Sequence, residues 1–273
     1  MSLWTRLRLA LEALPPQANT TTLQAPAVTS RYDEFVAVHL LKTNDVHYNG
    51  VFFVWHRHFL WLYNPDLRNL CRYTGPVPYW DWTLNSDDPR NSTVFDGSAC
   101  SLRGNGEYYP HGVTDLSLIN KHLIVALGTG RGCVTEGPFA KGTWTGHIGN
   151  DFNITDVPEL DDFPTSTAWD ALNKLHTAGG LTIGSLNNDV YASAGDPAIW
   201  LHHGMVDRAW AIWQGQDMEA RRYQVGATRT PFNDPPSARV AVDEFLDFTG
   251  LAERVTLKDV TSTLDGPYWY VYE

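Results

Sequence analysis

Two histidines bracket an aromatic-rich stretch in the first quarter of the chain. His47 and His56 lie within Asp45–Trp61, where many of the neighbours are valine, phenylalanine, tyrosine or tryptophan. A protein core accepts one neutral imidazole that is hydrogen-bonded to a backbone carbonyl. Several imidazoles in an apolar setting usually share a metal ion, because histidine is the commonest nitrogen ligand. The stretch therefore predicts a metal site with imidazole ligands.

A third histidine, His39, precedes this stretch. It lies eight positions before His47, and His56 lies nine positions after His47. Nine residues rotate by about 180° around a helix, so one continuous helix would place His47 and His56 on opposite faces. The three imidazoles can therefore converge only from different backbone directions.

The apolar periodicity supplies these directions. It predicts a helix that begins near Arg31 and has His39 close to its end. A turn containing His47 follows, and a second helix over Val51–Tyr63 contains His56. Three imidazoles without an accompanying carboxylate favour copper or zinc as the metal.

A second group of histidines lies far along the chain. His176 ends one predicted helix, and His202 and His203 lie in another, Pro197–Gln214. Neighbouring residues point about 100° apart on a helix, so only one of this histidine pair faces the site. Asp207 lies four residues after His203 on the same helical face, where a carboxylate can orient a ligand imidazole through its other nitrogen. Two helix pairs that present histidines inward predict a four-helix bundle with a two-metal centre.

Weaker patterns predict the rest of the fold, which we expect to be one domain over residues 1–273, because the sequence shows no linker or repeat. The predicted elements are a helix over 1–14, a break of the second helix at Asn64–Pro65–Asp66, long loops with a few short strands over Tyr73–Gly180, a helix over Thr167–His176, Asp196 as N-cap of Pro197–Gln214, a last helix over Ser237–Phe248 and a strand over the closing YWYVYE. The aromatic content, with 11 Trp and 12 Tyr, favours a buried site.

Charge and composition exclude several classes of partner. A net charge of -11 with few clustered basic residues argues against nucleic acid and against an anionic membrane. Sequons at Asn19, Asn91 and Asn153 point to a secreted protein. The three cysteines lack CxxC spacing and allow at most one disulfide; Cys71 with Cys133 is the expected pair, although Cys100 leaves the pairing open.

Four sequence motifs resemble those of the tyrosinase and catechol oxidase family. They are VHLLKTNDVHYNGVFFVWHR around the first histidines, PYWDWT at Pro78–Thr83, DPAIWLHHGMVDRAW at Asp196–Trp210 and Tyr270-Val271-Tyr272. The resemblance covers most of the chain and is strongest to short fungal members. It implies a mainly α fold, a central four-helix bundle around a binuclear copper site, and a catalytic domain without the C-terminal domain that shields latent enzymes.

The resemblance also implies a ligand set. The residues that match the family's copper A ligands are His39, His47 and His56, and those that match its copper B ligands are His176 and His203. The sixth ligand is missing, because Gly180 occupies the position four residues after His176 where family members have histidine. Losing an imidazole should lower copper affinity at least about tenfold. Alternatively, the Gly179-Gly180 pair is a helix C-cap and this site is remodelled.

Positions around the site follow from the same resemblance. Val190 matches a gate residue, and valine would leave copper A open. Ile199 replaces a phenylalanine over the substrate, and Leu181 is expected to line the same pocket. Thr177 replaces an asparagine that helps to hold a water for deprotonating a monophenol. We therefore expect diphenols to be better substrates than monophenols.

Three functions remain open at this point. The first is a copper-dependent oxidoreductase that oxidises o-diphenols to o-quinones with dioxygen, impaired to some degree by Gly180. The second is a degenerate or altered member with copper A alone, which binds a ligand or catalyses a mononuclear copper reaction. The third is an oxygen carrier similar to hemocyanin, against which the open gate at Val190 argues.

Overall fold

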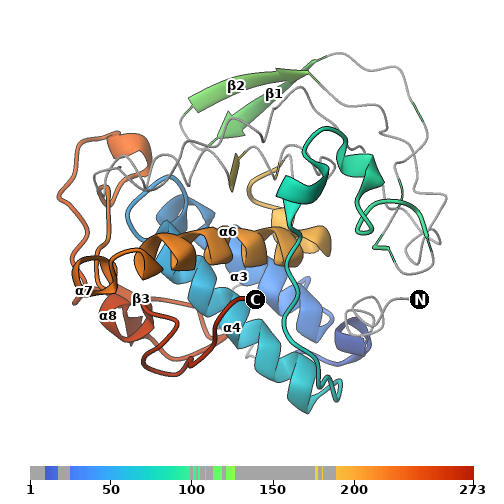
Figure 1. Cartoon of the computed structure of the whole chain (residues 1–273), viewed down its shortest axis with the longest axis horizontal. Coiled ribbons are helices and arrows are strands. Elements are labelled where there is room, and N and C mark those ends of the chain that lie inside the picture. Colours follow the sequence, from blue (N-terminus) through green and yellow to red (C-terminus); the bar gives the residue numbers. More distant parts are fainter. Residues whose placement is uncertain are drawn as a thin grey trace.

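Three long helices form the centre of the fold in the computed structural model (Figure 1). They are α3 (Arg31–Val46), α4 (Phe52–Asn69) and α6 (Ala198–Gly215). The structure describes residues 10–17, 25–98, 101–102, 104, 108, 113–118, 121–126, 176–177, 180 and 189–273. The shorter elements are η1 (Trp82–Asn85), η2 (Pro89–Asn91), β1 (Val113–Leu118), β2 (Lys121–Ala126), η4 (Ser193–Gly195), α7 (Met218–Arg221), η5 (Pro231–Asn233), β3 (Phe245–Leu246), β4 (Val255–Thr256) and α8 (Leu257–Val260). The mainly α prediction is confirmed.

Helix α3 begins where its sequence supplies a cap. The Ser30 hydroxyl accepts a hydrogen bond from the Asp33 amide, and the Asp33 carboxylate accepts one from the Ser30 amide, which forms a capping box. The helix ends at Val46, and Tyr48 then adopts a φ of 55°, which turns the chain toward α4. Helix α3 is longer than predicted, so His39 lies in its interior and not close to its end, whereas His47, the C-cap residue, lies at the start of the turn as predicted.

Helix α4 does not break at Pro65, so this prediction is wrong. The helix continues to Asn69 with Pro65 inside it. Contacts on both sides of the proline offset the lost backbone hydrogen bond. Tyr63 stacks on Trp200 with ring centroids 3.9 Å apart, and Asp66 accepts a hydrogen bond from Arg31 at 2.7 Å. Tertiary packing thus outweighs the local preference of proline.

Helix α6 confirms the predicted helix with a shift of one residue at its start. Pro197 is the N-cap residue, and the Asp196 carboxylate accepts a hydrogen bond from the Ala198 amide at 2.9 Å. Within the helix, a Cβ atom at Gly204 would lie only 3.1 Å from the Pro78 carbonyl oxygen. Glycine therefore lets the segment that begins at Pro78 pack directly on α6.

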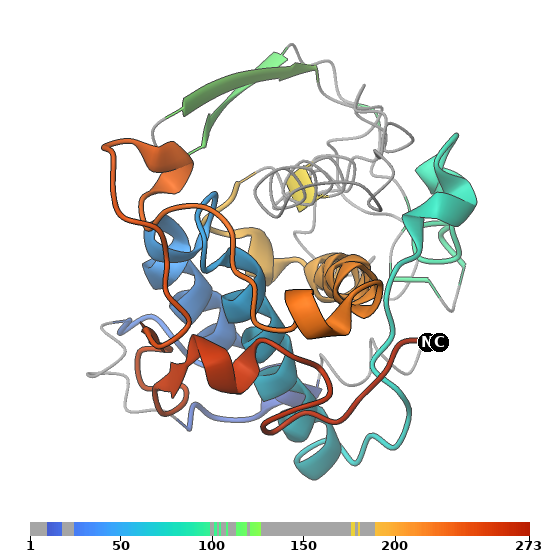
Figure 2. The same ribbon diagram turned by 60° about the vertical axis from the view of Figure 1, so that its left-hand side comes forward.

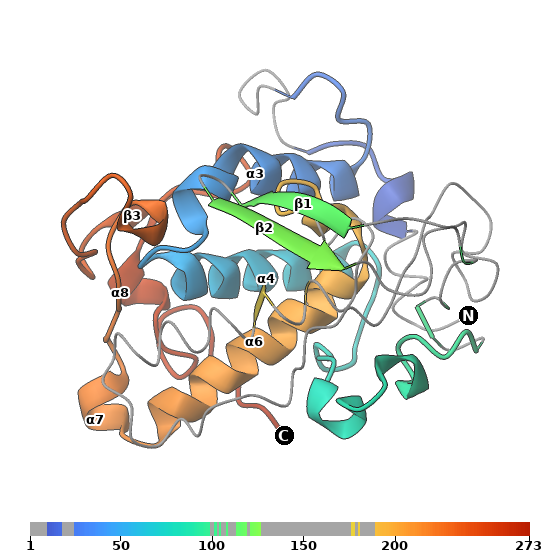
Figure 3. The same ribbon diagram turned by 90° about the horizontal axis from the view of Figure 1, so that it is seen from above.

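The remaining described segments surround the three helices. Strands β1 and β2 pair antiparallel, with Val113 opposite Ala126, and lie on one side of the helices, away from α7 and α8 (Figures 2 and 3). Together with the short 3-10 helices, they agree with the predicted loops and short strands. No helix in the described part of the chain is long and apolar enough to span a membrane.

Two predictions for the C-terminal quarter are wrong. Residues 237–244 form no helix: Arg239 makes a β-bridge with Thr228, and a turn follows at residues 242–243. The reason is that the Ser237 hydroxyl accepts a hydrogen bond from the Thr230 amide at 3.0 Å and Glu244 pairs with Arg229. The closing segment forms no strand, since Trp269 adopts a φ of 66°, and the hydroxyls of Tyr270 and Tyr272 bond to Asp207 of α6.

Other predictions fall on residues outside those described. They are the N-terminal part of the 1–14 helix, the helix before His176, Leu181, the Gly179 position and the pairing of Cys100 and Cys133. Residues 10–13, the described part of the first of these, are helical.

Candidate metal centre

The first three histidines converge in the interior of the protein. His39, His47 and His56 each offer one ring nitrogen, and these three atoms lie within 4.8 Å of one another. Their exposed fractions are 1%, 1% and 4%. His47 lies at the end of α3 and His56 in the first turns of α4. The two rings can therefore face each other, which one continuous helix would not allow.

Each of these rings is held through its Nδ1 atom. Nδ1 of His47 lies 3.0 Å from the Thr43 carbonyl oxygen, and Nδ1 of His56 lies 2.8 Å from that of Phe52. Nδ1 of His39 lies 3.3 Å from the carbonyl oxygen of Tyr191, a residue from the distant part of the chain. A carbonyl can only accept, so Nδ1 bears the proton and Nε2 keeps a free electron pair.

The Nε2 atoms of His39 and His56 are buried and have no hydrogen-bond partner among the described residues. Burying such groups is costly unless another ligand completes them. Burial lowers the pKa of His39 to about 4. It also lowers the pKa of His47 and His56 well below the usual value, with the neighbouring imidazoles adding to the effect. Neutral imidazoles with aimed electron pairs fit copper or zinc.

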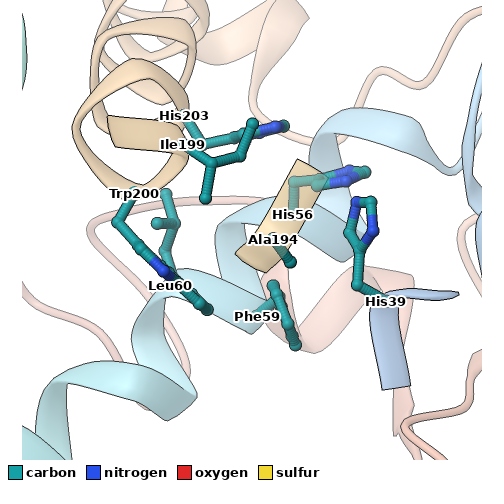
Figure 4. A pocket seen from close by; sticks show the side chains of 8 residues that line it. All are labelled: His39, His56, Phe59, Leu60, Ala194, Ile199, Trp200 and His203. Atoms are coloured by element: carbon teal, nitrogen blue, oxygen red, sulfur yellow. The ribbon is translucent and has the colours of Figure 1, made fainter. Parts of the chain in front are cut away.

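Two further histidines face this cluster. His203 on α6 stacks on His56 with ring centroids 4.5 Å apart and an interplanar angle of 13° (Figure 4). His176 lies 4.8 Å from His203 and 6.1 Å from His47, measured between ring centroids. Burial is the main effect that lowers the pKa of His176 and of His203 well below the usual value for histidine. The structure thus brings all five predicted imidazoles together.

The second group is smaller than the first. Within the described residues, His39, His47 and His56 form the one set of three or more ligands close enough to share an ion. Gly180 has helical backbone and is half-buried, and because Gly179 lies outside the described residues, the C-cap alternative stays a prediction. His176 and His203 offer two nitrogens for a copper ion, one fewer than the first group offers.

Two other buried histidines have structural contacts. Nε2 of His202 lies 2.9 Å from the carbonyl oxygen of His176, and Nδ1 of His58 lies 2.9 Å from the hydroxyl of Tyr268. Both rings are buried. These two histidines are therefore hydrogen-bonded within the fold. His202 also fixes the backbone of His176, because its ring bonds to that residue's carbonyl.

Asp207 does not orient a ligand imidazole, contrary to the prediction. Its carboxylate accepts hydrogen bonds from Arg57 on α4 and from the hydroxyls of Tyr270 and Tyr272, each at 2.5 Å. Arg57 also donates to the Thr261 carbonyl and stacks over the Trp210 ring. The reason is competition, because an arginine charge and two hydroxyls occupy the carboxylate. Asp207 therefore joins α4, α6 and the C-terminal segment.

Sequence patterns do not single out two residues that contribute to the centre. The Phe52 ring lies 4.5 Å from both His56 and His176, measured between centroids, and fills the space between the two histidine groups. The Tyr191 carbonyl orients His39. A backbone carbonyl has no signature in a sequence, whereas Phe52 was visible as one of several aromatic residues without a distinguishing position.

The predicted substrate positions lie near the centre in different ways. Thr177 follows His176, and its hydroxyl lies 3.5 Å from that of Tyr48, the residue after His47. Val190 is half-buried and precedes Tyr191, whose carbonyl holds His39. Ile199 is buried and faces the cavity between α4 and α6 that Figure 4 shows.

A cluster of buried neutral imidazoles inside a bundle of helices defines a histidine-ligated metalloprotein. Residues 29–166 and 151–216 match the family described as "Common central domain of tyrosinase". The chain belongs to the tyrosinase family, whose members are binuclear copper enzymes that use dioxygen and act on small phenols. The histidine cluster agrees with copper as the cofactor.

Individual relatives extend this similarity over nearly the whole chain. The sequence is 34% identical over 285 residues to Oxidase hkm6 of Aspergillus hancockii, which covers 88% of this chain and 99% of that protein. It is 32% identical over 306 residues to Tyrosinase P of Aspergillus terreus, with 94% and 84% covered. A solved structure of a mutant polyphenol oxidase from Thermothelomyces thermophila superposes with a TM-score of 0.88 at 32% identity, covering 99% of this chain and 84% of that one.

Proposed function

We propose that the protein oxidises o-diphenols to o-quinones with dioxygen, with weak or no hydroxylation of monophenols. The observation that supports this proposal most is the convergence of His39, His47 and His56, with two further imidazoles facing them. In the balanced reaction two catechols each lose two electrons and two protons, and one dioxygen becomes two waters. The bound copper pair supplies the electron transfer between phenol and dioxygen.

The ligand assignment is part of this proposal. His39, His47 and His56 hold the first copper through Nε2, while carbonyl oxygens fix their Nδ1 atoms. His176 and His203 hold the second copper, and Gly180 supplies no ligand there. Burial keeps these imidazoles neutral at physiological pH, so no proton competes with the metal.

Thr177 and Val190 shape the phenol side of the proposed site. Both are half-buried and lie beside residues that contact the histidines. A threonine hydroxyl is a weak base and offers one oxygen, so it assists poorly in removing a proton from a monophenol. A diphenol needs less of this assistance, which favours catechols as substrates.

A second candidate is a protein with the first copper alone. The observation that favours it is that one three-ligand set occurs within the described residues, whereas His176 and His203 provide two nitrogens. Such a protein would bind a phenol or catalyse a reaction at a single copper. It would not couple two metals to dioxygen.

Restoring the missing ligand distinguishes the two candidates. We expect the Gly180→His variant to raise the copper content toward two ions per chain and the rate of catechol oxidation at least about tenfold. Added imidazole should partly raise the rate of the unchanged protein. Gly215→His is the matched control, because a Cβ atom there meets nothing within 4 Å. Copper content is measured by elemental analysis and activity by dioxygen uptake.

Particular outcomes would contradict the proposal. If the unchanged protein holds one copper, oxidises no catechol and gains nothing from Gly180→His, the coupled-pair function fails and the single-copper candidate stands. Equal gains in Gly180→His and Gly215→His would show that Gly180 is not the lost ligand position.

We further propose that residues 1–273 act as one catalytic domain and that the protein is secreted. Asn91, one of the three sequon asparagines, is exposed at the end of η2 and so is open to glycosylation. A mass decrease on glycosidase treatment of protein from the culture medium tests secretion. Protein confined to the cell pellet and without glycan would contradict it.

A further inference from the structure

His39 differs from the other two histidines of the first group in the source of the carbonyl that orients it. His47 and His56 contact carbonyl oxygens of their own helices, at 3.0 and 2.8 Å. Nδ1 of His39 instead lies 3.3 Å from the carbonyl oxygen of Tyr191, which is 152 positions later in the chain. Tyr191 belongs to residues 189–196, the segment before α6, which we call the connecting segment. The orientation of His39 therefore depends on how this segment packs against α3.

Two tyrosine hydroxyls attach the connecting segment to α3 on both sides of this contact. The Tyr191 hydroxyl donates a hydrogen bond to the side-chain oxygen of Asn44, in the last turn of α3, at 2.9 Å. The hydroxyl of Tyr32, in the first turn of α3, donates to the Ala194 carbonyl at 2.9 Å. His39 lies between these two helix residues and lines the same small cavity as Ala194 (Figure 4). The segment thus contacts α3 at three points, and the middle one holds the proposed copper ligand.

Asp189 stabilises the turn that presents the Tyr191 carbonyl. Its carboxylate accepts hydrogen bonds from the amide of Tyr191 at 2.9 Å and from that of Ala192 at 3.4 Å. An aspartate that bonds to the amides two and three residues later is typical of a turn. These bonds involve backbone amides, so they remain when the side chain of Tyr191 is changed. Val190, the predicted gate residue, lies in the same turn, next to the carbonyl that holds His39.

The two hydroxyl contacts differ in what else depends on them. The Tyr32 hydroxyl also accepts a hydrogen bond from Nε1 of Trp200 at 3.2 Å, and both side chains are buried. Removing this hydroxyl would leave buried groups without partners and would destabilise the core. The Tyr191 hydroxyl bonds to Asn44, which is exposed, so water replaces the lost partner when this bond is removed. Tyr191 is therefore the residue at which the position of the carbonyl can be changed with little loss of stability.

We propose that Tyr191 is a positioning residue for the first copper: its hydroxyl, held by Asn44, fixes the carbonyl that orients His39. A neutral imidazole can bear its proton on either nitrogen, and a carbonyl at Nδ1 selects the form in which Nε2 is free to bind a metal. The proposal rests on the proposed function, because that function assigns His39 to the first copper. It adds that an exposed contact between Tyr191 and Asn44 controls the geometry of a buried ligand.

Nitrogen-15 NMR of the copper-free protein tests this role without turnover. Burial lowers the pKa of His39 to about 4, so the ring is neutral at neutral pH, and the shifts of its two nitrogens report which one bears the proton. We expect one tautomer, with the proton on Nδ1, in the unchanged protein and a mixture of tautomers in Tyr191→Phe and Asn44→Ala. Asn44→Asp keeps an oxygen that accepts from the Tyr191 hydroxyl and should retain the single tautomer. Tyr223→Phe is the matched control, because it removes a similar hydroxyl bond, to Asp265 at 2.7 Å.

Copper titration by calorimetry measures the consequence for the metal. Tyr191→Phe and Asn44→Ala should lower the affinity for the first copper about threefold to tenfold, because the carbonyl remains but is no longer fixed. Asn44→Asp should bind copper at least as tightly as the unchanged protein, and Tyr223→Phe should bind it equally. Chemical denaturation should show that Tyr191→Phe loses no more stability than Tyr223→Phe.

Several outcomes would overturn the proposal. They are a mixture of tautomers in the unchanged protein, a single tautomer in Tyr191→Phe, a copper affinity of Tyr191→Phe equal to that of Tyr223→Phe, and Asn44→Asp behaving as Asn44→Ala does. The proposed function fails separately. A protein that shows the expected tautomer change at His39 and oxidises no catechol would contradict that function and leave the positioning role of Tyr191 in place.

Discussion

The two histidine groups differ in how much of their geometry the chain prepares. In the first group, all three Nδ1 atoms contact carbonyl oxygens, and the three offered nitrogens lie within 4.8 Å. In the second, the Nδ1 atoms of His176 and His203 are buried without a hydrogen-bond partner among the described residues. Hydrogen bonds therefore orient the rings of the first group for a metal ion, whereas no such bonds at Nδ1 orient the two rings of the second group.

Local helix geometry explains part of this difference. His47 and His56 each contact the carbonyl four residues earlier, from Thr43 and Phe52. Thr43 lies in the last turn of α3, where carbonyls lack a helical partner and are free to hold a ring. His47 at the end of α3 and His56 inside α4 are thus each oriented by a carbonyl of their own helix. His176 and His203 depend on contacts between segments instead, such as the ring stacking on His56.

The largest expected effect is on the contact that joins the two groups. Asp207→Ala should lower the free energy of unfolding by about 3–5 kcal/mol, because it leaves the Arg57 charge buried without its carboxylate. Both side chains are buried, at 0% and 3% exposure. Chemical denaturation of the copper-free protein measures the change, with Asp243→Ala at an exposed site as the control. A loss comparable to that of the control would show that Asp207 does not hold α4 and α6 together.

Removing one histidine from each group tests the comparison directly. His56→Ala should lower affinity for the first copper about tenfold to a hundredfold or more, whereas His203→Ala should leave that ion bound. The reason is that His56 completes the prepared group and His203 belongs to the other. Copper titration by calorimetry measures both, and His58→Gln is the control because His58 bonds to Tyr268. Equal losses of the first copper in His56→Ala and His203→Ala would mean that the groups act as one site.

Sequence patterns located the site better than they located the fold boundaries. Histidine spacing required His39, His47 and His56 to come from a helix, a turn and a second helix, and the structure has this arrangement. Spacing works here because few backbone paths bring three separated residues together. The same kind of inference failed for Asp207, since a pattern shows which face a carboxylate lies on but not which donors compete for it.

Local signals failed where tertiary contacts outweigh them. Pro65 is a sound signal for a helix break, yet packing of Tyr63 and the ion pair of Asp66 hold α4 through it. Ser237 resembles an N-cap residue, but its hydroxyl bonds to Thr230, seven residues earlier. In both cases the deciding partner could not be identified before the fold was known.

A smaller effect is expected when Asp207 loses one of its hydroxyl donors. Tyr270→Phe should lower the free energy of unfolding by about 1–3 kcal/mol, because the carboxylate oxygen loses a buried hydrogen bond. Burial and the Asp207 charge raise the pKa of Tyr270 well above its usual value, so the hydroxyl remains a donor at neutral pH. Copper affinity should stay unchanged. A drop in copper affinity larger than about threefold would restore the idea that Asp207 orients a ligand.

The smallest effect concerns the cap of α3, the helix that contains His39. Ser30→Ala should lower the free energy of unfolding by about 1 kcal/mol, because it removes the hydroxyl that accepts from the Asp33 amide. Thr256→Ala removes a similar cap from α8 and is the control. If ring contacts alone prepare the first histidine group, both variants lose stability and neither loses affinity for the first copper. A loss of copper affinity in Ser30→Ala alone would show that the whole of α3, from its cap to His47, positions the first histidine group.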